Sequence, residues 1–483
     1  MCKRAGPCPV RHSHFVIGYF AIRHFNTRRL TSPVPACFPF RNSHFVIRHY
    51  FINMSPPPPD DSHLPHDAYA ALRIPEFRRY WAGNFLAILG SQMQFVAIGW
   101  DIYERTGQTL QLGLVGLVQV IPVVLLALPA GQVIDRRDRR HVIMAALAIM
   151  VACSLVLAGI AWQQADYRWI YVCLFLNGVA RAFLQPGKSA LLPLIVPRSR
   201  FTNAVTWSTS GFQLATVIGP AAGGLVIAAT GAALWVYLLD AALGLAFVIA
   251  LSGLRPRAPA ASHERIGMQS LLAGAAFVWR TKLILGAVSL DMFAVLLGGA
   301  TALLPVYAKV ILHSGADGLG WLRAAPGLGA LLTSYILTHR GPIQRAGKTM
   351  LWSVVGFAAA TVVFGLSRSF WLAWAMLFLT GACDMVSVVI RHSLIQLWTP
   401  DAMRGRVSAI NGMFIGISNE LGEFESGTVA HWFERPGDPA FGPTVSVVSG
   451  GMGTVLVVLM SIWLFPAMRR HGRLDESPTT GPA

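Results

Sequence analysis

The amino-acid composition excludes an ordinary soluble protein. Of the 483 residues, 54% are hydrophobic and only 13% are charged, whereas a soluble domain carries about 25% charged residues. The mean hydropathy of +0.53 also excludes a disordered chain, which requires low hydrophobicity and high charge. The surplus of apolar surface is therefore expected to face a lipid bilayer.

The formal net charge of +17 does not indicate a nucleic-acid partner. Eight of the 39 Lys and Arg residues precede position 54, where there is no Asp or Glu, and the remaining net charge of +9 is spread along the chain. The six cysteines show neither metal-ligand nor redox spacing. We therefore predict no nucleic-acid partner, no metal site and no cofactor.

The first 53 residues differ from the rest of the chain. The pentapeptide SHFVI occurs at residues 13–17 and again at 43–47, in blocks rich in His, Arg and Phe. A signal peptide is the alternative, since residues 15–22 are apolar and follow basic residues, but no small-residue cleavage pattern comes after them. We expect residues 1–53 to be a mistranslated or disordered extension and the cellular protein to begin at Met54, which an intact-mass measurement would test.

From residue 80 onward the chain consists of apolar stretches long enough to cross a bilayer core of about 30 Å, which takes roughly 20 helical residues. The sequence predicts an all-α membrane protein with twelve transmembrane helices. The expected spans are 80–103, 109–133, 141–163, 168–195, 202–229, 231–253, 283–308, 317–338, 348–367, 369–397, 405–432 and 444–467.

Basic residues in the short connections predict the orientation, because Lys and Arg are retained on the cytoplasmic side. With the N-terminus inside, the cytoplasmic segments hold 22 Lys and Arg residues and the outer segments hold five. We therefore expect a multi-pass protein of the bacterial inner membrane with both termini in the cytoplasm. The tails are residues 54–79 and 468–483.

The chain is predicted to contain two pseudo-symmetric six-helix bundles, residues 80–253 and 283–467. The longest connection between spans is basic and Pro-containing, and it defines a cytoplasmic loop at 254–282. The halves also resemble each other, since Pro197 and Pro400 are followed at similar distances by Gly211 and Gly416. Duplicated bundles are typical of transporters that rock about a site at the bilayer midplane.

The connection between the second and third spans contains a distinctive motif. It reads GQVIDRRDRR from Gly131 to Arg140. A basic cytoplasmic loop would explain the arginines, but not the glycine and the acid at this spacing. The segment resembles the GxxxDRxGRR signature of the major facilitator superfamily, with Asp138 in place of the second glycine. That resemblance implies a cytoplasmic gating role for Gly131, Asp135, Arg136 and Arg139.

The fifth span carries a second motif, Gly219-Pro220-Ala-Ala-Gly223-Gly224. Proline removes a backbone donor and small residues permit close approach, so this helix can bend and seal against a partner. The motif resembles the GPxxGG element of proton-coupled exporters in the same superfamily. Plain helix packing is an equally good explanation of these small residues.

A wider resemblance covers about residues 66–474. The segments RIPEFRRYWAGNFLAILGSQ, TPDAMRGRVSAIN and SNELGEFESG are similar to the transmembrane secretion effector branch of the superfamily, which includes enterobactin exporters. This resemblance implies proton-coupled efflux of a small organic molecule, a drug or a siderophore-like compound, by alternating access. The expected partners are protons, a small-molecule substrate and the lipid bilayer. We expect the protein to be a monomer.

Ionisable residues inside the spans mark the expected site, because each costs about 2.5–3.5 kcal/mol at the bilayer centre. Asp240 and Asp291 lie near mid-membrane, Arg181 and Asp384 lie deeper towards the cytoplasm, and Glu420 and Glu423 share a face of the eleventh span. We expect Asp291 to exchange the proton, with Asp384 as the second choice and Arg181 as the counter-charge. Glu425, Asp101 and Arg323 are expected to be structural, and permanent pairing of Asp291 with Asp384 is the alternative.

Two other classes of function are disfavoured. GPIQRAGKT at 341–349 has one residue too many for a phosphate-binding GxxxxGK[ST] loop, which argues against an ATP-driven pump. The spans contain no HExxH or GxSxG motif, so no membrane-embedded enzyme is predicted. Import or uniport on the same fold is the nearest alternative to efflux.

Overall fold

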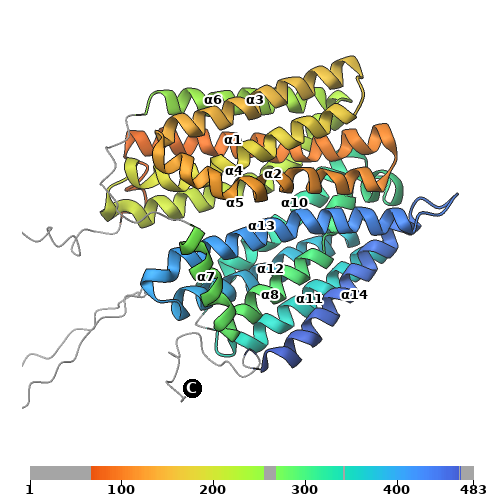
Figure 1. The fold of residues 1–483 in the computed structure, drawn as a ribbon. Coiled ribbons are helices and arrows are strands. Elements are labelled where there is room, and N and C mark those ends of the chain that lie inside the picture. The colour runs from red at the N-terminus through yellow and green to blue at the C-terminus, as the bar shows by residue number, and fades with distance from the viewer. Residues whose placement is uncertain (1–66, 255–267, 341–342, 467, 469–483) are drawn as a thin grey trace, which may run out of the picture. The chain divides into compact units, whose positions relative to one another are not determined.

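A computed structural model describes residues 67–254, 268–340, 343–466 and 468 (Figure 1). The chain divides into two units, Met1–Leu64 and Pro65–Ala483. The first unit, and with it the expectation for residues 1–53, lies outside the described residues. All described residues belong to the second unit.

The second unit is built from helices. Its elements are α1 (Pro75–Thr106), α2 (Thr109–Arg136), α3 (Arg139–Gln163), α4 (Arg168–Ile195), η2 (Arg198–Arg200), α5 (Phe201–Thr230), α6 (Leu234–Ser252), α7 (Met268–Arg280), α8 (Lys282–Leu297), η3 (Ala300–Leu303), α9 (Leu304–Val306), η4 (Tyr307–Ile311), α10 (Gly315–His339), α11 (Ala346–Leu366), α12 (Phe370–Trp398), α13 (Asp401–Trp432) and α14 (Phe441–Leu464).

The protein is an all-α membrane protein, and each of the twelve expected spans coincides with a long helical segment when α8 to η4 are taken together. Among the described residues, nine of these segments are long and apolar enough to cross a membrane by length and composition alone. The other three are α4, α10 and α13. They carry Arg181, Arg323 and the acidic run of the eleventh span, so polar residues lower their hydropathy.

The helices pack as two bundles that are related by pseudo-symmetry (Figure 1). In the first bundle α1 packs on α5 and α6, and α4 packs on α2 and α3; in the second, α12 packs on α10 and α11, and α14 packs on α11 and α13. Two helix pairs join the bundles, α2 with α13 and α5 with α10. Each pair combines the second helix of one bundle with the fifth helix of the other, as a duplicated unit requires.

The seventh span, expected at 283–308, lies within Lys282–Ile311, but the structure divides it into several short helical segments. Helix α8 ends at Leu297, and a short 3₁₀ segment, α9 and a π-helical turn carry the chain on to Ile311. The break falls at Gly298 and Gly299, where a Cβ on Gly299 would lie 2.5 Å from the carbonyl carbon of Gly422 in α13. The two glycines thus let the interrupted helix touch the backbone of α13.

The connection at 254–282 also contains structure that was not predicted. Its second half forms helix α7, which packs against α13 and α8. Val278 is buried in a cluster with Ile284, Val288 and Val407. Apolar residues at helical spacing account for this packing, so the connection is a loop only in part.

One end of the interface between the bundles is closed. A Cβ on Gly427 of α13 would lie 2.6 Å from the Cα of Gly113 in α2, and one on Gly224 of α5 would lie 2.8 Å from the Cα of Gly320 in α10. Both contacts lie in the helix halves that the charge pattern predicts to face outward. Only residues without a side chain permit such backbone contact.

The opposite end of the same interface is open. Gly131 is five whole helical turns from Gly113 on the same face of α2, yet a Cβ there would meet nothing within 4 Å. Gly416 lies about three turns before Gly427 on α13 and likewise has no neighbour within 4 Å. The two helices therefore touch in their outer halves and separate in their inner halves.

Candidate substrate pathway and charge clusters

Arg181 lies where the open part of the interface meets the closed part. Its Nη1 donates hydrogen bonds to Glu420 Oε1 of α13 at 2.9 Å and to Gln119 Oε1 of α2 at 3.0 Å. The Arg181 side chain is 44% exposed and that of Glu420 is 14% exposed. An ion pair from α4 to α13 thus joins the two bundles beside the opening.

A second ion pair joins helices of this interface at a similar depth. Arg323 Nη2 of α10 lies 3.7 Å from Glu423 Oε1 of α13. Its guanidinium also stacks over the Phe95 ring of α1, with Cζ 3.8 Å from the ring centre, a cation–π contact. Arg323 was expected to be an outer residue that pairs with an acid to hold helices together. It does pair with an acid, and that acid is the predicted site residue Glu423. We call Arg181, Glu420, Arg323 and Glu423 the interface cluster.

Asp291 and Asp384 belong to a different cluster, inside the second bundle. Asp291 of α8 forms an ion pair with Arg391 of α12, and both side chains are buried. Asp384 lies about two helical turns before Arg391 on α12 and lines the same small cavity of about 10 Å³ as Asp291. The expectation that Arg181 is the counter-charge of Asp291 is wrong, because Arg181 pairs across the interface and Asp291 pairs with Arg391.

Charge balance distinguishes the two clusters. The interface cluster contains two acids and two arginines, so it is neutral when all four are ionised. The cluster of Asp291, Asp384 and Arg391 contains two acids and one arginine, and no hydrogen-bond or ion-pair partner of Asp384 is found in the described ranges. The three residues therefore hold one more carboxyl group than guanidinium groups.

Asp240 lies in a third place, within the first bundle. Its Oδ2 accepts hydrogen bonds from Ser154 Oγ at 2.6 Å and Gln94 Nε2 at 2.9 Å, which ties α6 to α3 and α1. A Cβ on Gly90 would lie 2.6 Å from Asp240 Oδ1. Asp240 is thus close-packed away from the interface and does not join either of the other clusters.

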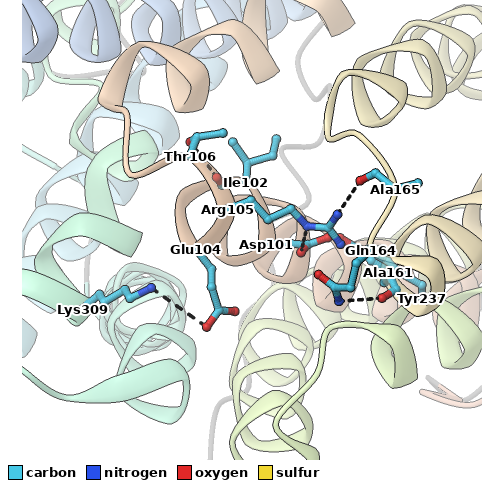
Figure 2. Close-up of polar contacts among 10 residues, drawn as sticks. All are labelled: Asp101, Ile102, Glu104, Arg105, Thr106, Ala161, Gln164, Ala165, Tyr237 and Lys309. Carbon is cyan, nitrogen blue, oxygen red and sulfur yellow. Dashed lines mark hydrogen bonds and ion pairs between the residues drawn. The ribbon is translucent and has the colours of Figure 1, made fainter.

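The outer ends of the bundles carry a polar network of their own (Figure 2). Asp101 accepts a hydrogen bond from Arg105 Nε at 2.7 Å, and Arg105 Nη1 donates to the carbonyl of Ala165 at 2.9 Å. Figure 2 also shows Glu104 of α1 facing Lys309 of η4, 4.0 Å away in the other bundle. These contacts fix the end of α1 and add one cross-bundle ion pair to the closed end.

At the opposite end, the loop motif caps neighbouring helices. Asp138 occupies the position where the superfamily signature has its second glycine. It is the N-cap of α3, and its side chain accepts a hydrogen bond from the backbone N–H of Arg140 at 2.9 Å, which stabilises the turn into α3. Arg139 Nη1 donates to the carbonyl of Ala190 in α4 at 3.1 Å.

The other predicted gating residues of the motif make no such contact among the described side chains. Arg136 is exposed, and the side chain of Asp135 lies outside the described part. Gly131, which was expected to permit close helix approach, faces open space here because the inner helix halves are apart.

The GPxxGG motif packs on two helices at once. A Cβ on Gly219 would lie 3.0 Å from the Leu89 carbonyl oxygen of α1, and one on Gly223 would lie 3.0 Å from the Cα of Met93. Gly224 faces the other bundle, and a Cβ on Gly320 would lie 2.7 Å from the Pro220 carbonyl oxygen. Three glycines and one proline therefore place α5 between α1 and α10.

We expect Gly224→Leu to disfavour closure of the outer end. A leucine has no room against Gly320, and overpacking costs about 1–3 kcal/mol, which disfavours the closed state roughly 5–150-fold. Transport should fall at least about fivefold while membrane insertion is unchanged, as measured by efflux rate at matched abundance. Gly159→Leu in α3 is the control, because a Cβ there meets nothing within 4 Å; equal losses in both variants would contradict the role of this contact.

Comparison with known proteins identifies the family. Residues 66–438 match the family described as transmembrane secretion effector. The chain belongs to this family. It is therefore a transporter of the major facilitator type and not an enzyme.

Individual relatives agree with this assignment. The chain is 29% identical over 415 residues to the enterobactin exporter EntS of Citrobacter koseri, covering 84% of this chain and 96% of that protein. It is 28% identical over 412 residues to EntS of Shigella boydii, covering 84% of this chain and 95% of that protein. A bacterial homologue of the human lysosomal transporter Spinster, solved in an inward-facing, unoccupied conformation, has the same fold with a TM-score of 0.62 at 14% identity, covering 82% of this chain and 96% of that one.

Within the described ranges, no group of three or more His, Cys, Asp or Glu side chains could hold a metal ion. The functional groups that the structure brings together are instead the four of the interface cluster and the three around Arg391. Sequence reasoning named five of these seven residues as site candidates. It noted Arg391 only as a neighbour of Asp384 and assigned Arg323 to the outer surface.

Proposed function

We propose that the protein exports a small organic molecule across the bacterial inner membrane in exchange for protons, by alternating access, with both termini in the cytoplasm. The observation that carries the proposal is the interface cluster at the boundary between a closed and an open half of the interface. With the orientation predicted by the positive charges, the opening faces the cytoplasm. The described state is then the one that loads a substrate for export.

The interface cluster would serve both the substrate and the closure. Glu420 Oε1 binds Arg181, but the buried Glu420 Oε2 has no hydrogen-bond partner among the described residues. The partly exposed Arg181 guanidinium can bind an anionic or hydroxyl group that enters from the opening. A substrate that binds Arg181 or Glu420 would weaken the ion pair between them. Loss of this contact between α4 and α13 would permit the outer end to open.

The cluster around Arg391 would carry the proton. Its surplus carboxyl group is buried at membrane depth, and the adjoining cavity of about 10 Å³ has room for about one water molecule, which could pass the proton. When Asp291 is paired with Arg391, Asp384 is the group that holds the proton. Release of this proton would leave an uncompensated charge and would favour a different packing of α8 and α12.

Uptake into everted membrane vesicles is the direct test of this function. Because two of the relatives are enterobactin exporters, the first compound to test is enterobactin, followed by a panel of small organic molecules. Export predicts uptake into everted vesicles that is driven by an imposed proton gradient and abolished by a protonophore. Accumulation in right-side-out vesicles instead would establish import, and transport that ignores the gradient would establish uniport.

The loop motif gives a separate prediction for Asp135. Asp135→Asn removes a charge with little change of volume, so insertion and abundance should persist while efflux falls several-fold. The physical reason is that a carboxylate at the inner end of α2 can interact with a helix N-terminus and arginines when the inner halves close. Efflux equal to that of the parent protein at matched expression would refute a gating role for Asp135.

A further inference from the structure

A groove on the second bundle has the dimensions and chemistry of a lipid site. It lies between α10, α11 and α12 and encloses about 640 Å³, within the usual range of about 300–1,000 Å³ for ligand pockets. Its helix α11 packs on α12 and α14 and not on the interface helices of the first bundle (Figure 1). The groove is therefore separate from the substrate opening and faces the surrounding lipid.

The depth of the groove matches one leaflet of a bilayer. Arg345 is the N-cap of α11, and the groove extends down to Cys383, whose Sγ would lie 2.9 Å from a Cβ on Gly356. Gly356 is ten residues into α11, about 15 Å along the helix axis. A bilayer core is about 30 Å thick, so the groove spans about half of it.

The charged groups lie at one end of the groove only. Arg345 and Lys348 form its rim, are exposed, and have no ion-pair or hydrogen-bond partner among the described residues. Trp352, which is 72% exposed, lies one turn deeper, the level at which tryptophans occupy the membrane interface. Below it the wall carries no charged group and contains Ser353 and apolar side chains such as Val386.

We propose that this groove binds one anionic phospholipid of the cytoplasmic leaflet, with the phosphate headgroup at Arg345 and Lys348 and an acyl chain along α12. The pattern of positive charge above an apolar channel is complementary to an anionic amphiphile, and basic pockets between membrane helices on this side bind such headgroups. Cys383 lines both the groove and the small cavity at Asp291 and Asp384. A bound acyl chain thus lies next to the acid pair that we propose to carry the proton.

Native mass spectrometry of the full-length protein tests this site with added dioleoylphosphatidylglycerol or dioleoylphosphatidylcholine. The double variant Arg345→Gln/Lys348→Gln should weaken binding of the anionic lipid about thirtyfold, since each basic residue near the surface is worth about 1 kcal/mol, and should leave the zwitterionic lipid unaffected. The matched control is Arg280→Gln/Lys282→Gln, which removes one exposed Arg and one exposed Lys from the same membrane side of the same bundle.

Two further measurements keep the proposal falsifiable. Val386→Trp fills the groove without changing its charge and should also weaken binding of the anionic lipid at least tenfold. Glycerol 1-phosphate, the soluble headgroup, should not displace the lipid. Equal loss of affinity in both double variants, an unchanged affinity in Val386→Trp, or displacement by glycerol 1-phosphate would each overturn the assignment.

Discussion

Asp384→Asn is expected to uncouple transport from the proton gradient. One charge moved across 100 mV is worth about 2.3 kcal/mol, which supports a substrate gradient of roughly fiftyfold. The variant should lose this accumulation and reach only equilibrium, because its amide cannot release a proton. Substrate binding and substrate exchange should persist, since Asp384 lies within the second bundle and away from Arg181.

Uptake in everted vesicles with and without a proton gradient measures this effect, and Asp240→Asn is the matched control. Asp291→Asn is a less clean variant, because it leaves Arg391 buried without its partner, and removing one member of a buried ion pair costs about 3–5 kcal/mol. We therefore expect Asp291→Asn to lower abundance as well as coupling. Gradient-driven accumulation in both Asp384→Asn and Asp291→Asn would move the assignment to Glu420 and Glu423.

Arg181→Gln is expected to lower the rate of efflux at least tenfold. The Arg181–Glu420 pair is partly exposed, so its loss is worth about 1 kcal/mol in the equilibrium between states, and the loss of a substrate-binding cation adds to this. Efflux at matched abundance measures the effect. Arg168→Gln is the control on the same helix, since its ion pair with Asp166 is 3.9 Å long and largely exposed.

A charge exchange separates structural pairing from substrate binding. If the pair serves mainly to join the bundles, Arg181→Glu/Glu420→Arg should restore most of the rate that each single change removes. If Arg181 contacts the substrate, the exchange should restore abundance and conformation but not transport. A double-mutant cycle with no coupling between the two positions would show that the 2.9 Å contact has no role in the cycle.

The fold was predictable because hydropathy acts locally. Apolar runs of twenty or more residues and basic connections depend only on nearby residues, and each expected span has its helix. The break at Gly298 and Gly299 was missed because two glycines in a membrane helix are compatible with a straight helix; only contact with Gly422 in α13 distinguishes the two cases.

The candidate site was predictable only in part. The cost of burying a charge singles out Asp291, Asp384 and Arg181 from the sequence. Their partners depend on which helices of different bundles meet, and no local signal carries that information. Arg323 illustrates the limit, since the sequence indicates pairing with an acid but not with which one. Only the meeting of α10 with α13 and α1 places it against Glu423 and Phe95.

The glycine contacts at the closed end have a consequence for the energy of the transport cycle. Helices surrounded by lipid gain no hydrophobic free energy when they associate, because lipid tails are as apolar as the surfaces they replace. A closure made at Gly113–Gly427 and Gly224–Gly320 is therefore held by dispersion forces between bare backbones, aided by a few ion pairs such as Glu104–Lys309. Each contact buries little surface, so the two contacts can separate and re-form without a large input of work.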